Sequence, residues 1–354
     1  MKKLFLIGDP LNTAYQIEGL TEVSFEKKGN AYQIESDAGL VGAVEFLLSR
    51  KSYSPSSRIY NCFVNDDAKI EKVLENNLDA RLQDFNQGID SNVFLARVLT
   101  AANDFYLSKE KLLPREISEY QLRAKAYYTF VDSLRKLNLY ANNSMLATLI
   151  KDCRGTEMYK DGLLWGRSEA GNLINLPPEP IKKYIKSFEE GAVICKEGAL
   201  DGEMYVLLKG SISVQVGSTF VAQLSLPGEA IGELSLFLDD RRSATLIADE
   251  KVFLYVIPQE QLLDFHSSHP DVFLIIARTT ADRIYRVLER INRFSYAFST
   301  SEVDQEKLYS LKKELANKGR SELRNLQKQF KEVCEAANDS RLTQIWERMQ
   351  GLEN

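Results

Sequence analysis

Apolar side chains recur at intervals of three or four positions in residues 116–153, 270–292 and 302–354. This spacing places them along one face of an α-helix, so it predicts a helix in each stretch. Pro114 precedes the first stretch as a helix-start signal. In the last stretch, Gly319 predicts a break between two helices, and hence a helical hairpin. The apolar face of the first helix is formed by Tyr120, Ala124, Tyr127, Val131, Leu134 and Leu137.

Short apolar runs separated by glycines fill residues 188–248 and predict strands joined by tight turns. Pro227 and Gly228 end one of these strands, because both residues favour turns. Residues 233–237 predict a single helical turn, and the apolar run at 245–248 predicts the strand after it.

A glycine, a carboxylate and a guanidinium lie close together in this stretch. Gly232 allows a ligand to approach the backbone, and the helical turn after it leaves backbone N–H groups without partners. Arg242, nine residues after Glu233, would add charge-assisted hydrogen bonds to a phosphate. Because two anions repel, Glu233 is expected to accept a hydrogen bond from a hydroxyl beside that phosphate, such as a ribose 2′-hydroxyl. A phosphate and a ribose hydroxyl in one pocket indicate a nucleotide.

The residues Gly-Glu-Leu at 232–234 and Arg-Ser-Ala-Thr at 242–245 resemble the phosphate-binding cassette of the cyclic-nucleotide-binding domains. Such domains occur in the regulatory subunits of protein kinase A and in the catabolite activator protein. The resemblance covers about residues 181–293, and Gly198 and Gly210 stand at the expected turns. It implies a β-roll that binds a cyclic nucleotide.

The resemblance also implies a set of ligand-binding residues. Backbone amides of Gly232, Leu234 and Ser235 would bind the cyclic phosphate, Arg242 would neutralise it, and Glu233 would hold the ribose. Ser243 follows the arginine, where similar kinase domains often carry Ala for cAMP and Thr for cGMP. Its hydroxyl is compatible with either, and we favour cAMP over cGMP. The base would lie against Val214, Ile231, Leu224 and Ala244.

In the resembled domains, the helix that corresponds to residues 270–292 lies over the base and often pairs two subunits. The catabolite activator protein places Thr-Ser on it to reach adenine, and Val287 and Leu288 stand there in this chain. We therefore expect an apolar lid, with Arg283 and Tyr285 as secondary contacts. A homodimer through this helix or through the tail is an open alternative to a monomer.

The first part of the chain repeats the pattern of the later one. Gly42 precedes Gly232 by 190 residues and is followed by a similar apolar run. Ala43 stands where Glu233 stands, and Ser52 where the guanidinium is expected, although Arg58 is a candidate substitute. The interpretation is a degenerate β-roll that binds no cyclic nucleotide and serves in packing; a changed ligand is the alternative.

These patterns predict an α+β protein with two β-roll, jelly-roll-like domains joined by a helical region and followed by a helical tail. The predicted segments are a degenerate β-roll with its helix at 1–107, a helical linker at 108–180, a cyclic-nucleotide-binding domain at 181–293 and the tail at 294–354. Within them, residues 154–180 predict an irregular connection, and 181–187 a short helix.

Net charge, apolar runs and cysteine spacing limit the range of possible functions and locations. A formal net charge of −5 gives no electrostatic footprint for nucleic acid or for an anionic membrane. No stretch approaches the roughly 20 apolar residues of a membrane-spanning helix, and the apolar run at 4–7 is too short for a signal peptide. Cys62, Cys153, Cys195 and Cys334 lack metal or redox spacing and predict free thiols in a reducing cytoplasm.

Catalytic and metal-binding motifs are not evident. His266 and His269 have metal-like spacing but no third ligand nearby, so they are interpreted as the end of a helix before Pro270. The sequence has no P-loop or zinc constellation, and we expect no enzyme, no metal and no cofactor. Three functions remain open: a cyclic-nucleotide sensor acting on an unidentified protein partner, a constitutive scaffold with a non-binding pocket, and a DNA-binding regulator with an unrecognised head. The tail carries no evident helix-turn-helix, which disfavours the last.

Overall fold

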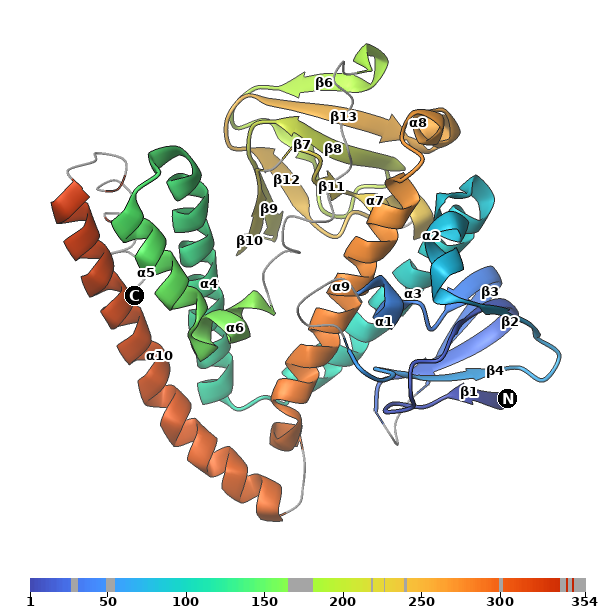
Figure 1. Ribbon diagram of the computed structural model, residues 1–354, viewed down its shortest axis with the longest axis horizontal. Coiled ribbons are helices and arrows are strands. Elements are labelled where there is room, and N and C mark those ends of the chain that lie inside the picture. The colour runs from blue at the N-terminus through green and yellow to red at the C-terminus, as the bar shows by residue number, and fades with distance from the viewer. Residues whose placement is uncertain are drawn as a thin grey trace. The chain divides into compact units, whose positions relative to one another are not determined.

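The computed structural model describes residues 1–26, 31–48, 55–164, 181–217, 219–225, 227–238, 241–298, 302–337, 342 and 346 (Figure 1). Its contacts divide the chain into two compact units. The first unit comprises residues 1–105 and 168–288, and the second comprises 106–167 and 289–354. Helices α3 (Phe85–Glu110) and α9 (Val272–Arg293) each continue across this division. The four-segment division expected from the sequence stays a prediction.

The first unit begins with a five-stranded antiparallel sheet in the order β1-β4-β2-β3, with β5 paired to β2. Helix α1 (Val44–Leu47) follows β3, and α2 (Glu75–Gln83) leads into α3. The strands are β1 (Lys2–Phe5), β2 (Ala14–Ser24), β3 (Tyr32–Val41), β4 (Asn61–Val64) and β5 (Lys69–Val73).

The same unit also contains two four-stranded antiparallel sheets, ordered β10-β9-β12-β7 and β11-β8-β13-β6. The chain is thus a mixed α/β protein with antiparallel sheets. The strands are β6 (Ile185–Phe188), β7 (Val193–Cys195), β8 (Glu203–Lys209), β9 (Ile212–Val216), β10 (Thr219–Leu224), β11 (Ala230–Ile231), β12 (Thr245–Ala248) and β13 (Val252–Pro258). The helices are α7 (Glu233–Leu238) and α8 (Leu262–Ser268), with 3-10 turns at Lys182–Tyr184 and Gln259–Gln261.

The short helix predicted at residues 181–187 is wrong. Only one 3-10 turn forms there, and β6 begins directly after it at Ile185. Lys186 lies opposite Leu254 of β13 in an antiparallel ladder. Pairing with a neighbouring strand overrides the local helical preference, which is a weak prior.

Strand pairing in the first sheet follows the same register as pairing in the two later sheets. Each ladder of β1–β5 has a counterpart with partners at matching positions, whereas β2 is one continuous strand where β8 and β9 are separate. Matching pairs are Ala14–Val73 and Met204–Ile257, Tyr15–Val41 and Tyr205–Ile231, Phe5–Cys62 and Cys195–Leu246, and Ser24–Asn61 and Gln215–Thr245.

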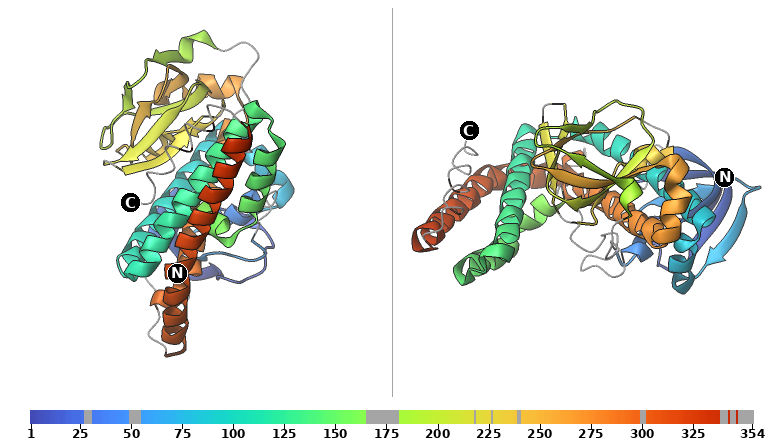
Figure 2. Two further views of the ribbon diagram at one scale, coloured as in Figure 1. Left: turned by 90° about the vertical axis from the view of Figure 1, so that its left-hand side faces the viewer. Right: turned by 90° about the horizontal axis from the view of Figure 1, so that it is seen from above.

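The second unit is helical. It contains α4 (Arg115–Ala141), α5 (Ser144–Arg154), α6 (Glu157–Leu163), a 3-10 turn at Ser295–Phe298 and α10 (Glu302–Ala337). Helix α10 runs alongside α4, as the views of Figures 1 and 2 agree. The core of the unit includes the predicted stripe of α4, of which Tyr120, Ala124, Tyr127, Val131 and Leu134 are buried, whereas Leu137 lies outside the described side chains.

Three boundaries in this unit differ from the expectation. The helix predicted over 116–153 is two helices, because Asn142 adopts a left-handed conformation and the Asn143 side chain caps α5, both roles that asparagine favours. The region 154–180 is not wholly irregular, since α6 occupies its start; residues 165–180 lie outside the described residues. The break predicted at Gly319 is wrong, because α10 continues through that residue and the described stretch 302–337 is one helix instead of a hairpin. A glycine costs a helix only about 1 kcal/mol, and residues on both sides of it are buried in one core.

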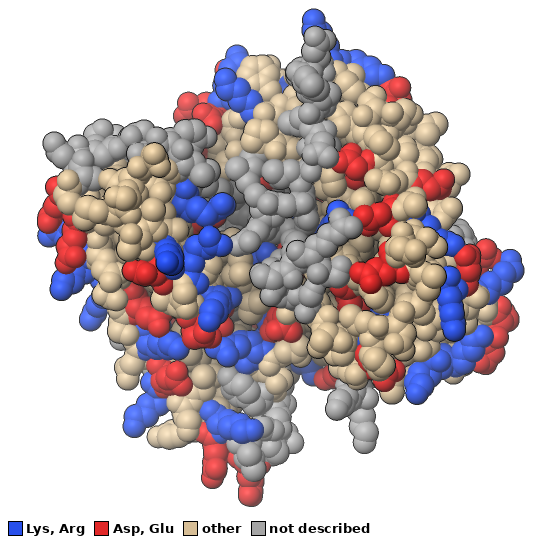
Figure 3. Space-filling view, viewed as in Figure 1, with Lys and Arg blue, Asp and Glu red and all other residues tan. Residues whose placement is uncertain are grey.

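The surface carries charges of both signs. Figure 3 shows basic and acidic side chains interspersed on one face. Among the described residues, no helix combines the length and the apolar character that crossing a bilayer requires.

Candidate functional site

Arg242 lies just before β12 with its side chain buried. Its Nη1 donates to the Ser235 hydroxyl at 2.8 Å and to the Gly232 carbonyl oxygen at 3.3 Å. The structure therefore brings together the predicted glycine, the serine of the predicted helical turn α7 and the predicted arginine. All three surround one buried corner of the domain.

Three further residues hold the guanidinium from β8 and the loop before it. Arg242 Nη2 donates to the Glu203 carbonyl oxygen at 2.7 Å and to the Tyr205 hydroxyl at 3.1 Å, and it forms an ion pair with Asp201. Burial raises the pKa of the Tyr205 hydroxyl, while the arginine opposes that shift. Tyr205 therefore stays protonated and accepts the bond through its oxygen.

Gly232 lies directly against the Arg242 guanidinium. Its φ is +88°, a conformation that disfavours other residues. A Cβ at this position would lie 2.3 Å from Arg242 Nη1 and 3.1 Å from the Glu203 carbonyl oxygen. Both the backbone conformation and the space thus require glycine.

Glu233 is the first residue of α7, and its side chain is buried. It forms an ion pair with Arg283, which comes from α9 and is partly exposed. Leu234 follows on α7 and is half-buried. The carboxylate expected to bind a ribose hydroxyl is thus paired with a basic residue of the helix expected to cover the base.

The four residues expected to enclose the base belong to one apolar cluster of the domain. Val214 and Leu224 are buried within it, and Ile231 and Ala244 pack against it. Ser243, in contrast, has an exposed side chain. On α9, Val287 and Leu288 are buried and Tyr285 is half-buried.

Sequence reasoning did not identify Asp201, Glu203, Tyr205 or the pairing of Arg283 with Glu233. The aromatic position of Tyr205 in the predicted hairpin could have been noticed. The contribution of Glu203, however, is a backbone carbonyl and has no residue signal. Asp201 contacts Arg242 from 41 positions away, and only the fold brings the two together.

The remaining candidates lie as follows. Arg58 is buried against Gly42, whose carbonyl oxygen accepts from its Nη1 at 2.6 Å; Ala43 is buried, and Ser52 lies outside the described residues. His269 stacks on Phe265 with ring centroids 4.2 Å apart. Among the described residues, no group of three His, Cys, Asp or Glu side chains is placed to hold a metal ion.

Comparison with known proteins gives a family for part of the chain. A curated relative, the Pycsar effector protein BcPycTIR of Burkholderia cepacia, is 25% identical over 107 residues, which are 30% of this chain and 35% of that protein. The chain thus matches about a third of that relative's length.

Solved structures also match. One described as Sp-2Cl-cAMPS bound to PKAR CBD2 is 21% identical over 24% of this chain and 57% of its own, with a TM-score of 0.22. Another, from work on a cyclic-GMP-dependent signalling pathway that regulates bacterial phytopathogenesis, is 24% identical over 25% of this chain and 72% of its own, with a TM-score of 0.23. The family model of the cyclic nucleotide-binding domain matches residues 185–269, which include the corner around Arg242, so the chain contains a domain of that family.

Proposed function

We propose that the protein is a cyclic-nucleotide sensor whose 181–293 domain binds cAMP, in preference to cGMP, and signals to a separate protein partner. The observation that carries this proposal is the buried corner formed by Gly232, Ser235 and Arg242 within a matched cyclic nucleotide-binding domain. The Arg242 guanidinium is oriented by four neutral oxygens and paired with one carboxylate, Asp201, whose place an anionic ligand would take.

In the proposed mechanism, the cyclic phosphate approaches Arg242 and the backbone amides of the turn that begins at Gly232. The phosphate would replace Asp201 as the anion paired with Arg242. Glu233 would accept a hydrogen bond from the ribose hydroxyl and so weaken its ion pair with Arg283. Val214, Leu224, Ile231 and Ala244 would enclose the base.

The output would pass through α9, because Arg283 belongs to that helix. A ligand shifts a conformational equilibrium only by the difference in its affinity for the two states. The ion pair between Glu233 and Arg283 supplies such a difference, since the ligand-bound and ligand-free states would pair Glu233 differently. Helix α9 or the tail remains the proposed surface for a partner or a second copy.

We further propose that residues 1–107 are a degenerate copy of the second domain. The proposal is supported by the matching strand registers and by the placement of Arg58 against Gly42, as Arg242 lies against Gly232. This copy would bind no cyclic nucleotide and would serve in packing. We propose no catalytic step and no cofactor. The four cysteines of the protein are buried free thiols, which is consistent with the proposed location in a reducing cytoplasm.

The competing function is a scaffold with a permanently closed pocket. It is favoured by one observation: both terminal nitrogens of Arg242 already bond to protein groups, including Asp201. A ligand must therefore displace an internal carboxylate. Binding measurements distinguish the two functions directly.

The test is calorimetry of the purified chain with cAMP and cGMP, on the wild type and on Arg242→Ala. Removing one partner of a buried, hydrogen-bonded charge pair costs about 2–5 kcal/mol. Since 1.4 kcal/mol is tenfold, affinity is expected to fall roughly 30-fold to several thousand-fold. The matched control is Arg241→Ala, because the neighbouring Arg241 is exposed and should leave affinity nearly unchanged. A wild-type chain that binds neither nucleotide supports the scaffold, and an unchanged affinity in R242A contradicts the assigned pocket.

A further inference from the structure

The first unit consists of two stretches of chain, residues 1–105 (the first half) and residues 168–288 (the second half). Glu45 and Arg58 form a buried ion pair in the first half. Arg58 Nη1 lies 3.2 Å from Glu45 Oε2, and the two side chains are 0% and 2% exposed for the glutamate and the arginine. The backbone N–H of Ile59 donates to the other carboxylate oxygen, Oε1, at 3.0 Å. Arg58 Nη2 also donates to the carbonyl oxygen of Thr13.

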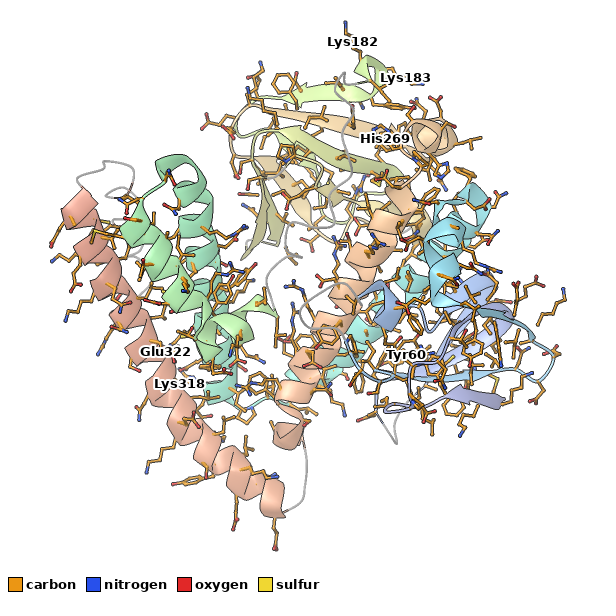
Figure 4. All side chains as sticks on the ribbon, in the orientation of Figure 1. Tyr60, Lys182, Lys183, His269, Lys318 and Glu322 are labelled. Atoms are coloured by element: carbon orange, nitrogen blue, oxygen red, sulfur yellow. The ribbon has the colours of Figure 1, made fainter. Side chains whose placement is uncertain are left out.

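Aromatic rings surround this pair. The Arg58 guanidinium lies 4.4 Å from the centroid of the Phe5 ring. Phe5 packs edge-on against Tyr60, and the Tyr60 hydroxyl accepts a hydrogen bond from Gly42 N at 2.9 Å. Figure 4 places Tyr60 within this part of the structure. Glu45 therefore lies in a closed and largely dry environment.

A similar arrangement occurs around Arg242, although that guanidinium also contacts the Tyr205 hydroxyl and pairs with Asp201. Each arginine donates through Nη1 to the carbonyl oxygen of a glycine with positive φ, Gly42 or Gly232. Each also donates through Nη1 to the residue three positions after that glycine. That residue is Glu45 in the first half and Ser235 in the second. A carboxylate thus stands where the second half carries a neutral hydroxyl.

We infer that the Glu45 carboxylate substitutes for a ligand phosphate. It supplies the negative charge that pairs with Arg58 and occupies the space beside that guanidinium. The site in the first half is therefore closed to an external anion by the Glu45 side chain. Removing Glu45 opens an anion site of the phosphate class against Arg58. The inference rests on the proposed repeat of the two halves, but not on nucleotide binding by the second half.

A buried charge without its partner is strongly unfavourable, so a chain lacking the Glu45 carboxylate is destabilised unless another anion pairs with Arg58. An anion that binds only the folded state restores stability in proportion to the logarithm of its concentration over its dissociation constant. Serine is the informative replacement, because it reproduces the residue of the second half and vacates space. Glutamine is its matched control, because it removes the charge but fills the space.

The experiment uses the full chain in an Arg242→Ala background, so that anion effects at the second half are absent. Thermal unfolding of Glu45→Ser and Glu45→Gln is followed as inorganic phosphate is raised, against sodium chloride of equal ionic strength. We expect both variants to melt below the parent chain. Only E45S should regain its unfolding temperature with phosphate, and calorimetry should show one phosphate bound per chain.

Several outcomes overturn the inference. They are a folded E45S variant that gains nothing from phosphate beyond the chloride control, an equal gain in E45Q, and an E45S variant that stays unfolded in high phosphate. Cyclic nucleotide bound by the R242A chain at Arg58 would also overturn it, since Glu45 would not then close the first half. Failure of the wild type to bind nucleotide would contradict the proposed function and leave this result intact.

Discussion

At the residue scale, a glycine and an arginine determine the geometry of the buried corner that we propose as the nucleotide site. Arg242 can lie against the backbone of Gly232 because no Cβ intervenes, and the positive φ at Gly232 turns its carbonyl oxygen toward the guanidinium. The two requirements, space and conformation, can be separated by mutation, because Gly198 of the same domain shares only the conformation.

Gly232→Ala is expected to destabilise the protein and to abolish nucleotide binding. The substitution forces a left-handed conformation on alanine, at about 1–2 kcal/mol, and places its Cβ 2.3 Å from Arg242 Nη1. The arginine must move, which removes it from the proposed phosphate position. Denaturant unfolding and calorimetry with cAMP measure the two effects.

The control is Gly198→Ala. Gly198 has a φ of +79°, but no atom lies within 4 Å of the position that an added Cβ would take. This variant carries the conformational cost without the collision, so it should lose similar stability and keep its nucleotide affinity. Equal loss of affinity in the two variants would mean that backbone strain, not the approach of Arg242, sets the pocket.

The sequence predicted the central residues of this corner and not their surroundings. The spacing of Gly232 and Arg242 carried the prediction, because both lie on one short segment. Asp201 and the Glu203 carbonyl oxygen contact the same guanidinium from the loop before β8 and from β8 itself. Such contacts depend on tertiary folding, and a backbone carbonyl leaves no trace in the residue type.

At the element scale, the helix predicted most accurately is one with a long apolar stripe. Helix α9 extends over Val272–Arg293, close to the predicted 270–292, and Ile284 and Ile291 of its stripe are buried. Boundaries failed where local signals conflicted with packing: α10 continues through Gly319, whereas α4 ends at Asn142 inside an apparently continuous stripe. Asn142 ends α4 through its left-handed backbone conformation. The spacing of apolar residues alone does not reveal such a helix end.

The end of α8 yields a prediction on pH. Burial lowers the pKa of His269, while the Phe265 carbonyl and Asp271 oppose the shift. The folded state therefore disfavours the charged form, whereas the unfolded chain takes up a proton near the ordinary value of 6.5. Stability is fully present above that value and falls as pH decreases below it, toward the lower pKa of the folded state.

His269→Phe should reduce this loss, because phenylalanine can keep the stacking on Phe265 and does not titrate. The measurement is the free energy of unfolding between pH 7.5 and pH 5, which is about the range in which histidine titrates. Carboxyl groups contribute equally to both chains, so the difference between them isolates His269. Parallel curves for variant and wild type would show that His269 protonates equally in both states.

At the scale of the whole molecule, helix α9, like α3, has residues in both compact units. Helix α9 begins in the first unit, where Arg283 pairs with Glu233 and Arg278 pairs with Asp79. It ends in the second unit at Arg293, whose side chain bonds to Asp161. The sequence predicted consecutive segments and did not indicate that α9 has residues in both units. Membership of a unit depends on which segments pack together, and these can be distant in sequence.

Hydrogen exchange should therefore report nucleotide binding along α9 and not only in the matched domain. Added cAMP is expected to slow exchange at residues 228–245 and to change it in 272–293, since Glu233 changes partner and Arg283 loses its anion. In Arg283→Ala, protection of 228–245 should persist while the response of α9 disappears. Arg278→Ala is the matched control, because Arg278 lies on the same helix but pairs with Asp79, and its chain should respond as the wild type does. A response of α9 that survives in R283A would place the coupling in the apolar contacts of Val287 and Leu288, because those side chains are buried on the same helix.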